Sequence, residues 1–189
     1  MLPAFSDDGK KVAYCVSRGS GNCQIYYLEN KELTQITDNA GNNISPAIAH
    51  DGKNIYFCSD VSGRPSIYCF DRDTQELERI TKNASSMSPS YCTTQNRLAY
   101  CQKIDGIYQV CMYDPKEDRH QKMTFGPGQK SECCWSPCGN YVLYAVERSH
   151  KQHLEVLNVL SGVTHTLAVS GNCSYPTWST CYQEFPMVA

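Results

Sequence analysis

Residues 45–57 read Ser-Pro-Ala-Ile-Ala-His-Asp-Gly-Lys-Asn-Ile-Tyr-Phe, a short apolar run followed by a turn and a second apolar run. The turn contains Asp51-Gly52, a pair that favours two-residue β-hairpins because glycine adopts positive φ without steric cost. Ile55-Tyr56-Phe57 is β-branched and aromatic, which is typical of strands. The segment therefore predicts two antiparallel strands joined by a tight turn.

This segment is one copy of an internal repeat. Its start recurs along the 189-residue chain at spacings of 43, 43, 44 and 43 residues, at Pro3, Pro46, Pro89, Cys133 and Pro176. A turn position follows each start by six residues and is occupied by Gly9, Gly52, Gln95, Gly139 and Tyr182. Such a period indicates a repeat architecture in which each copy is one supersecondary unit.

Each repeat contains four short candidate strands. After the turn comes a second apolar run, such as Ile55–Cys58, then a third, such as Ile67–Phe70, and a more polar fourth, such as Leu77–Thr81. The second run is apolar on both faces, so both faces of its sheet must be buried, whereas a charged fourth strand suits an exposed edge. Four-stranded units buried by their neighbours are typical of β-propeller blades; the strands of a β-sandwich, the alternative, do not repeat at a fixed period.

The sequence therefore predicts an all-β fold, a β-propeller of four-stranded blades with a 43–44-residue repeat, in a single region over residues 1–189. Four complete blades are expected, followed by one extra inner strand. The expected boundaries are 1–43, 44–86, 87–130 and 131–173 for the blades and 174–189 for the final strand.

The repeat resembles that of the TolB family of propellers. Residues 45–57 are similar to the family pattern S-P-A-W-S-P-D-G-K-x-I-A-F, Ser62–Tyr68 to the G-R-P-Q-I-Y segment after it, and Leu77–Thr81 to the closing L-x-R-I-T. Similar repeats occur in prolyl-oligopeptidase-like and tricorn-like peptidases, which continue into a hydrolase domain. TolB proteins end shortly after a final P-A-W-S, and Pro176–Ser179 near the end of this chain favours that family.

The resemblance implies an N-terminal α/β domain followed by a six-bladed propeller. We therefore interpret the chain as the C-terminal part of a longer protein, without that domain and about two blades. A four-bladed ring with a spare strand is the alternative. As a part of a ring, the chain is expected to expose two apolar blade faces and to self-associate.

Twelve cysteines are present. Cys15, Cys58 and Cys101 occupy the same position in three successive repeats beside an aromatic residue, which predicts small buried side chains between blades, too far apart to bond to one another. The sequence does not define the connectivity of other candidates for pairing, namely Cys133, Cys134, Cys138, Cys173 and Cys181.

Composition and motifs exclude several functions. The net charge of −2 offers no electrostatic basis for binding nucleic acid, and no apolar run is long enough for a transmembrane segment. The sequence lacks G-x-S-x-G, a phosphate-binding loop and H-E-x-x-H, so no enzyme activity is predicted. Cys134-x3-Cys138 with His150-x2-His153 does not match a standard zinc motif. We therefore expect neither a metal site nor a cofactor.

The resemblance also implies a binding face. Propellers usually bind partners at one end, through loops that lead into the innermost strands. In TolB-like proteins, this face docks the peptidoglycan-associated lipoprotein Pal. Ile44 and Met87 are expected to be exposed apolar anchors in these loops. The partner-binding positions implied by the resemblance are Leu2, Ile44, Ser45, Met87, Ser88 and Glu132.

The function implied by the resemblance is that of a non-enzymatic, periplasmic protein-binding module of the Tol-Pal envelope system. Its partners would be Pal and other Tol proteins, and it would support outer-membrane integrity, protein transport and cell division. The export signal is expected on the missing N-terminal part. The alternatives are the propeller of a peptidase that lacks its hydrolase domain, and a surface or sugar-binding propeller outside the Tol system.

Overall fold

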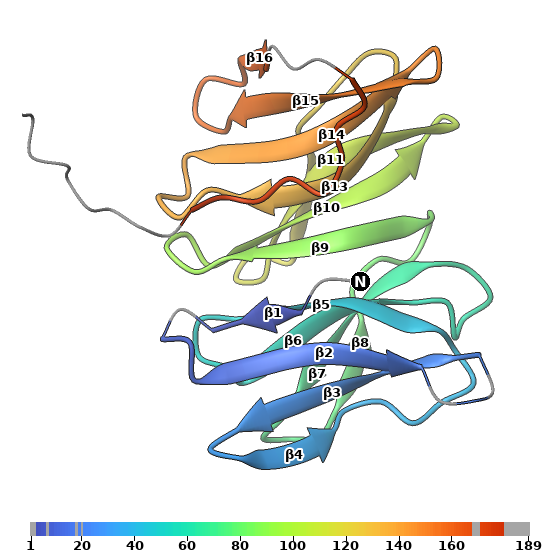
Figure 1. Cartoon of the computed structure of the whole chain (residues 1–189), viewed down its shortest axis with the longest axis vertical. Helices are drawn as coiled ribbons and strands as arrows, with labels where there is room; N and C mark the ends of the chain where they lie inside the picture. Colours follow the sequence, from blue (N-terminus) through green and yellow to red (C-terminus); the bar gives the residue numbers. More distant parts are fainter. Residues whose placement is uncertain (1–2, 7, 18, 20, 168–170, 180–189) are drawn as a thin grey trace, which may run out of the picture.

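A computed structural model describes residues 3–6, 8–17, 19, 21–167 and 171–179. Within these ranges the chain forms four antiparallel sheets of four strands each, stacked in sequence order (Figure 1). The first two sheets contain β1 (Ala4–Phe5), β2 (Lys11–Ser17), β3 (Cys23–Glu29), β4 (Glu32–Gln35), β5 (Asn43–Ile48), β6 (Asn54–Ser59), β7 (Ser66–Asp71) and β8 (Leu77–Arg79). The other two contain β9 (Ser86–Cys92), β10 (Arg97–Ile104), β11 (Ile107–Asp114), β12 (Arg119–Lys122), β13 (Gln129–Trp135), β14 (Tyr141–Arg148), β15 (Lys151–Asn158) and β16 (Thr164–Thr166).

Each sheet is a meander in which consecutive strands pair. The first strands, β1, β5, β9 and β13, pack against the first strands of neighbouring sheets, so they are the inner strands. The fourth strands β4 and β16 are exposed along their whole length, as the charged sequence of the fourth run predicts. This arrangement confirms the predicted all-β propeller fold.

Three apolar cores lie between successive sheets. The core between the first and second sheets includes Tyr27 and Phe57, and the next includes Tyr100 and Ile67. The third joins Cys101 and Val110 of the third sheet to Val142 and Tyr144 of the fourth. Burial of both faces explains why the second and third strands lack the alternation of a half-exposed strand.

A threonine after the fourth strand is part of the repeat. Thr37, Thr81 and Thr124 are buried, and their Oγ1 atoms accept hydrogen bonds from the backbone N–H groups of third-strand residues at 2.8, 2.8 and 2.9 Å. Each hydroxyl satisfies a buried donor that the short fourth strand does not reach. The sequence marks these positions as Ile-Thr or Met-Thr.

The predicted two-residue turn at Asp51-Gly52 is wrong. Ala49 N–H donates to Asn54 O at 2.9 Å, so the loop comprises residues 50–53. Gly52 takes a positive φ of 66° and Asp51 does not. The Asp51 carboxylate instead accepts hydrogen bonds from the N–H groups of Lys53 and Asn54 at 2.8 and 3.3 Å, which stabilises the longer loop.

The chain after the fourth sheet packs against β13. Residues 171–179 are not assigned to a strand, but the Cys134 thiol donates to Pro176 O at 3.2 Å and Trp178 Nε1 donates to Cys134 O at 3.3 Å. Residues 180–189 of the predicted final strand, including Tyr182, lie outside the described residues, as does Cys181. The described part thus contacts the inner strand without pairing in a ladder.

Candidate functional site on the inner strands

A bulge interrupts the inner strand of the second, third and fourth sheets. The pairing register shifts between Ile44 and Ala47 in β5 and between Ser131 and Cys134 in β13. In β9 it shifts between Met87 and Ser90, opposite Ala99–Cys101 of β10. At each bulge one non-glycine residue adopts a left-handed conformation, namely Ser45 (φ 54°), Ser88 (φ 55°) and Glu132 (φ 54°). Tyr175, at the corresponding position of the next repeat, has a φ of 53°.

These bulges are a property of the repeat. A left-handed residue other than glycine costs about 1–3 kcal/mol and persists only where its surroundings impose it. An inter-sheet contact holds the bulge at Ser88, because the Cys133 thiol of the next sheet donates to Ser88 O at 3.2 Å. Bulges often redirect side chains beside functional sites. The row of left-handed residues is therefore the candidate site.

The structure brings together several of the predicted partner-binding residues. Ser45, Ser88 and Glu132 lie at equivalent, half-buried points of three neighbouring inner strands. Glu132 also reaches the next repeat, because its Oε2 atom accepts a hydrogen bond from Tyr175 N–H. Leu2 lies outside the described residues.

The prediction that Ile44 and Met87 are exposed loop anchors is wrong. The inner strands begin earlier than the sequence indicated, at Asn43 and Ser86, so both residues lie within strands. They are half-buried and pack against the core between the second and third sheets, which is favourable because it removes apolar surface from water. Each directly precedes a left-handed serine, Ser45 or Ser88.

A pocket lies at the same end of the inner strands, between the third and fourth sheets. Its volume is about 470 Å³. It is lined by Ile107, Pro127, Gly128, Gln129, Glu147, Arg148, Ser149 and His150. Arg148 carries no sequence signal, and His150 was considered only as part of a zinc pattern, because the β14–β15 turn uses Ser149 and His150 at positive φ (50° and 62°) without a glycine to mark it.

Two buried charged groups lie beside this pocket. Lys130 is 1% exposed, and its Nζ donates to Gly126 O and Pro127 O at 2.9 and 3.1 Å, while burial lowers the pKa of its amine. Glu155 accepts hydrogen bonds from Tyr144 OH and Arg148 Nη2, both at 3.0 Å. These bonds hold Arg148 and the Gly126–Gly128 segment in place.

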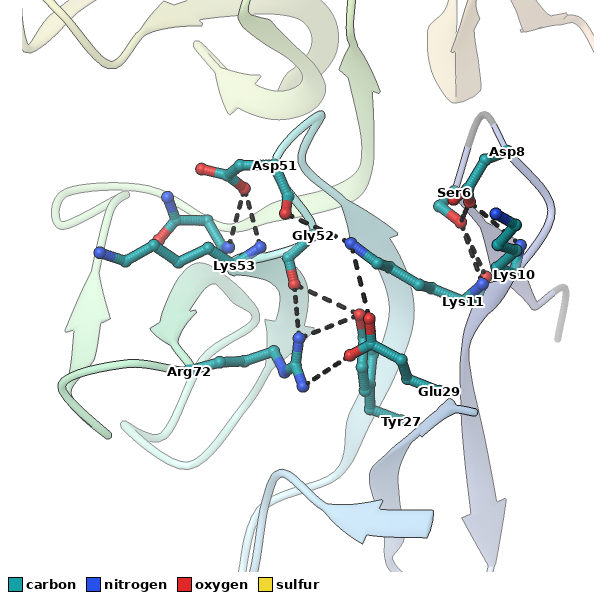
Figure 2. Close-up of polar contacts among 11 residues, drawn as sticks. Ser6, Asp8, Lys10, Lys11, Tyr27, Glu29, Asp51, Gly52, Lys53 and Arg72 are labelled. Carbon is teal, nitrogen blue, oxygen red and sulfur yellow. Dashed lines mark hydrogen bonds and ion pairs between the residues drawn. The ribbon is translucent and has the colours of Figure 1, made fainter. Parts of the chain in front are cut away.

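A polar network ties the first two sheets together (Figure 2). Arg72 Nη2 contacts Glu29 Oε2 at 3.0 Å, and Nη1 donates to Tyr27 OH and Gly52 O at 3.1 and 2.9 Å. Lys11 approaches the other Glu29 oxygen at 3.7 Å. Burial raises the pKa of Tyr27 to about 12, so its hydroxyl stays protonated. These residues join the first two sheets, and their polar groups bond to one another.

The described residues offer no cluster of three or more His, Cys, Asp or Glu side chains that could hold a metal ion. Cys134 and Cys138 form separate contacts, to Pro176 O and to Ser136 Oγ, and His153 contacts Glu155 at 3.1 Å. The described chain also has no helix long and apolar enough to span a bilayer.

Successive four-stranded sheets whose inner strands pack against one another place this chain in the β-propeller class. The family model "TolB beta propeller domain" (PD40) matches residues 1–182. The chain belongs to that family.

Individual relatives of this chain include TolB proteins. The "Tol-Pal system protein TolB" of Francisella tularensis subsp. tularensis (strain WY96-3418) is 25% identical over 186 residues, which cover 94% of this chain and 42% of the relative. The chain thus spans less than half the length of this curated relative. The crystal structure of TolB from Acinetobacter baumannii is similar with a TM-score of 0.77 and 21% identity, over 88% of this chain and 43% of that one.

Peptidase propellers have the same fold. A puromycin-hydrolyzing peptidase from Mycobacterium tuberculosis is similar with a TM-score of 0.71 and 13% identity, over 87% of this chain and 28% of that one. At this identity the likeness concerns the fold alone.

Proposed function

We propose that this chain is the protein-binding propeller of a periplasmic, non-enzymatic component of the Tol-Pal system, and that it binds the lipoprotein Pal. The match of the TolB propeller family to residues 1–182 carries this proposal. In the cell, the complete protein would act in outer-membrane integrity, protein transport and cell division. It would have further Tol proteins as partners.

The inner-strand row supplies suitable chemistry for such binding. Ser45 and Ser88 offer small hydroxyl groups, Glu132 a carboxylate, and Ile44 and Met87 the edges of apolar side chains. Apolar anchors beside adaptable polar contacts are typical of protein interfaces. Because the strands beneath are held by ladders and buried cores, the row would meet a partner in a preformed geometry.

A pair of aspartates tests this site. Aspartate tolerates a left-handed backbone better than most residues, so Ser45→Asp combined with Ser88→Asp keeps the bulges and adds two charges to the row. In the full-length protein, we expect this variant to bind the soluble part of Pal at least about tenfold more weakly in a calorimetric titration, a loss of about 1.4 kcal/mol.

The matched control places the same two charges on outer strands. Leu33 on β4 and Leu77 on β8 are 56% and 45% exposed, and Leu33→Asp with Leu77→Asp should bind Pal as the parent does. Equal Pal affinity for the inner-strand variant and the parent would reject the proposed site. Failure of the parent itself to bind Pal would reject the proposed partner.

The peptidase alternative has weaker support. It rests on similarity of fold at 13% identity, whereas the TolB family matches by sequence over nearly the whole chain.

A further inference from the structure

Two buried thiols meet between the third and fourth sheets. Cys101 in β10 is 0% exposed and Cys133 in β13 is 5% exposed, and both belong to the core that joins these sheets. The Cys133 thiol donates to Ser88 O at 3.2 Å, and Ser88 directly follows Met87, the β9 residue that pairs with Cys101, so the two thiols are neighbours. Strands β10 and β13 pack against one another, so the contact links neighbouring sheets.

The repeat shows that this interface differs from the others. Cys15, Cys58 and Cys101 are equivalent, since each pairs with an aliphatic residue of the third strand, Ile25, Ile67 or Val110. The inner strand of the next sheet has one residue directly after its left-handed position. That residue is Pro46 in the sheet after Cys15, Pro89 in the sheet after Cys58 and Cys133 in the sheet after Cys101. A second thiol therefore replaces the ring of the repeat's proline at one interface.

Other nearby cysteines are poorly placed to pair with Cys101. Cys111 belongs to the core between the second and third sheets, so it lies on the opposite face of the third sheet. The Cys134 thiol is directed to Pro176 O. Cys92 pairs with Arg97, at the far end of the ladder in which Cys101 is opposite Met87.

We propose that Cys101 and Cys133 form a disulfide that links the third and fourth sheets when the protein meets a disulfide oxidant such as oxidised glutathione. One thiolate attacks the oxidant and releases one reduced glutathione. The second thiolate then displaces the other glutathione from the mixed disulfide. In total, the two cysteines lose two protons and two electrons, and one oxidised glutathione becomes two reduced molecules.

The surroundings predict slow exchange in the closed protein. The neighbouring Cys101 side chain and burial raise the pKa of the Cys133 thiol well above its usual range, so little thiolate is present. Reaction therefore requires transient opening of the interface between the two sheets, and mild denaturant should accelerate it.

Peptide mapping tests the pair. The full-length protein is equilibrated with oxidised and reduced glutathione in low urea, acid-quenched, alkylated and digested for mass spectrometry. We expect a linked pair of peptides containing Cys101 and Cys133, and a higher thermal midpoint in oxidised than in reduced protein.

Two variants make the result specific. Cys133→Pro restores the residue found in the other repeats, so it should fold, lack the linked peptides and show no effect of oxidant on its thermal midpoint. Cys58→Ser removes the equivalent cysteine of the second sheet, at an interface where the repeat has Pro89 in place of a second cysteine, and should retain the linked peptides. Recovery of Cys101 and Cys133 as separate alkylated thiols, while other cysteines are oxidised, would overturn the proposal, as would linkage of either one to a different cysteine.

Discussion

Single side chains decide how the first two sheets join. Arg72 is half-buried over the ring of Tyr27, with its guanidinium carbon 3.9 Å from the ring centroid, and it also contacts Glu29 and Gly52 O. Each contact is modest alone, because partly exposed ion pairs contribute about 0–1 kcal/mol. Together they anchor the β7–β8 turn on the neighbouring sheet.

Replacement of Arg72 by alanine should therefore destabilise the protein. We expect Arg72→Ala to lower the free energy of unfolding in urea by about 1–2 kcal/mol, through lost packing on the aromatic ring and lost hydrogen bonds. Arg64 is exposed in the preceding turn, so Arg64→Ala should change it by less than about 0.5 kcal/mol. Equal effects of the two substitutions would contradict a bridging role.

Buried thiols predict that the stability of the fold decreases at alkaline pH. Burial raises the pKa of Cys58, Cys69, Cys111 and Cys134 to about 12 from a usual value of 9.0. The unfolded chain releases these protons first, so their contribution is complete below pH 9 and is lost as pH rises toward 12.

The urea midpoint of unfolding should accordingly fall steadily above pH 9. Cys58→Ala removes one of these groups, so its midpoint should be lower at pH 7 because of the lost side chain, but should decline less steeply between pH 9 and 11. A midpoint of the parent that stays constant over that range would contradict the stated effect of burial.

Among the elements of the fold, the bulged inner strand is the most unusual. Serine or glutamate at positive φ is uncommon, and its recurrence in β5, β9 and β13 shows that inter-sheet packing imposes it. The element presents a half-buried polar side chain at the same height in successive sheets. This regular placement gives the candidate site its geometry.

Ser88 provides the simplest test of this backbone. Valine cannot adopt a left-handed φ without a clash between its branched side chain and the backbone, so Ser88→Val should lower the free energy of unfolding by about 1–3 kcal/mol. Ser88→Gly should be neutral or slightly stabilising, because glycine adopts this conformation freely. Chemical denaturation of both variants measures the difference, and equal stability would mean that the bulge does not constrain position 88.

Periodicity in the sequence was sufficient to predict the four-stranded repeat, although not the bulges. Residues such as Ile67–Phe70 and Leu77–Arg79 repeat at one spacing with different polarity, so the strands, their order and the exposed fourth strand follow from local pattern. The length of the hairpin loop at residues 50–53 could not be predicted from the sequence pattern. The Asp51 side chain accepts a hydrogen bond from the backbone and so stabilises a longer loop than the Asp-Gly pair alone suggests.

The candidate site was only partly predictable. Ser45, Ser88 and Glu132 stand before the Pro or Cys of each repeat, and that position could be found by alignment of the repeats. Their left-handed backbone and the half-burial of Met87 could not be predicted from the sequence, because both depend on the neighbouring sheet. The contact of Cys101 with Cys133 depends on the same inter-sheet packing.

Over the described residues, the molecule is a succession of four sheets with an apolar core between each pair of neighbours. The inner strands of successive sheets contact one another, so a ligand on the row can touch three sheets at once. Family membership explains why the chain repeats in this way, and the bulged row indicates where we propose that a partner binds.

Oxidative footprinting of Met87 tests the central claim most directly. The full-length protein is exposed to brief methionine- and aromatic-directed oxidation with and without saturating Pal, and labelling is quantified by mass spectrometry. We predict that Pal decreases labelling of half-buried Met87 on β9 and leaves Phe125, which is 72% exposed beyond β12, unchanged. Unchanged labelling of Met87 with Pal at saturation, or protection of Phe125 instead, would contradict binding at the inner strands.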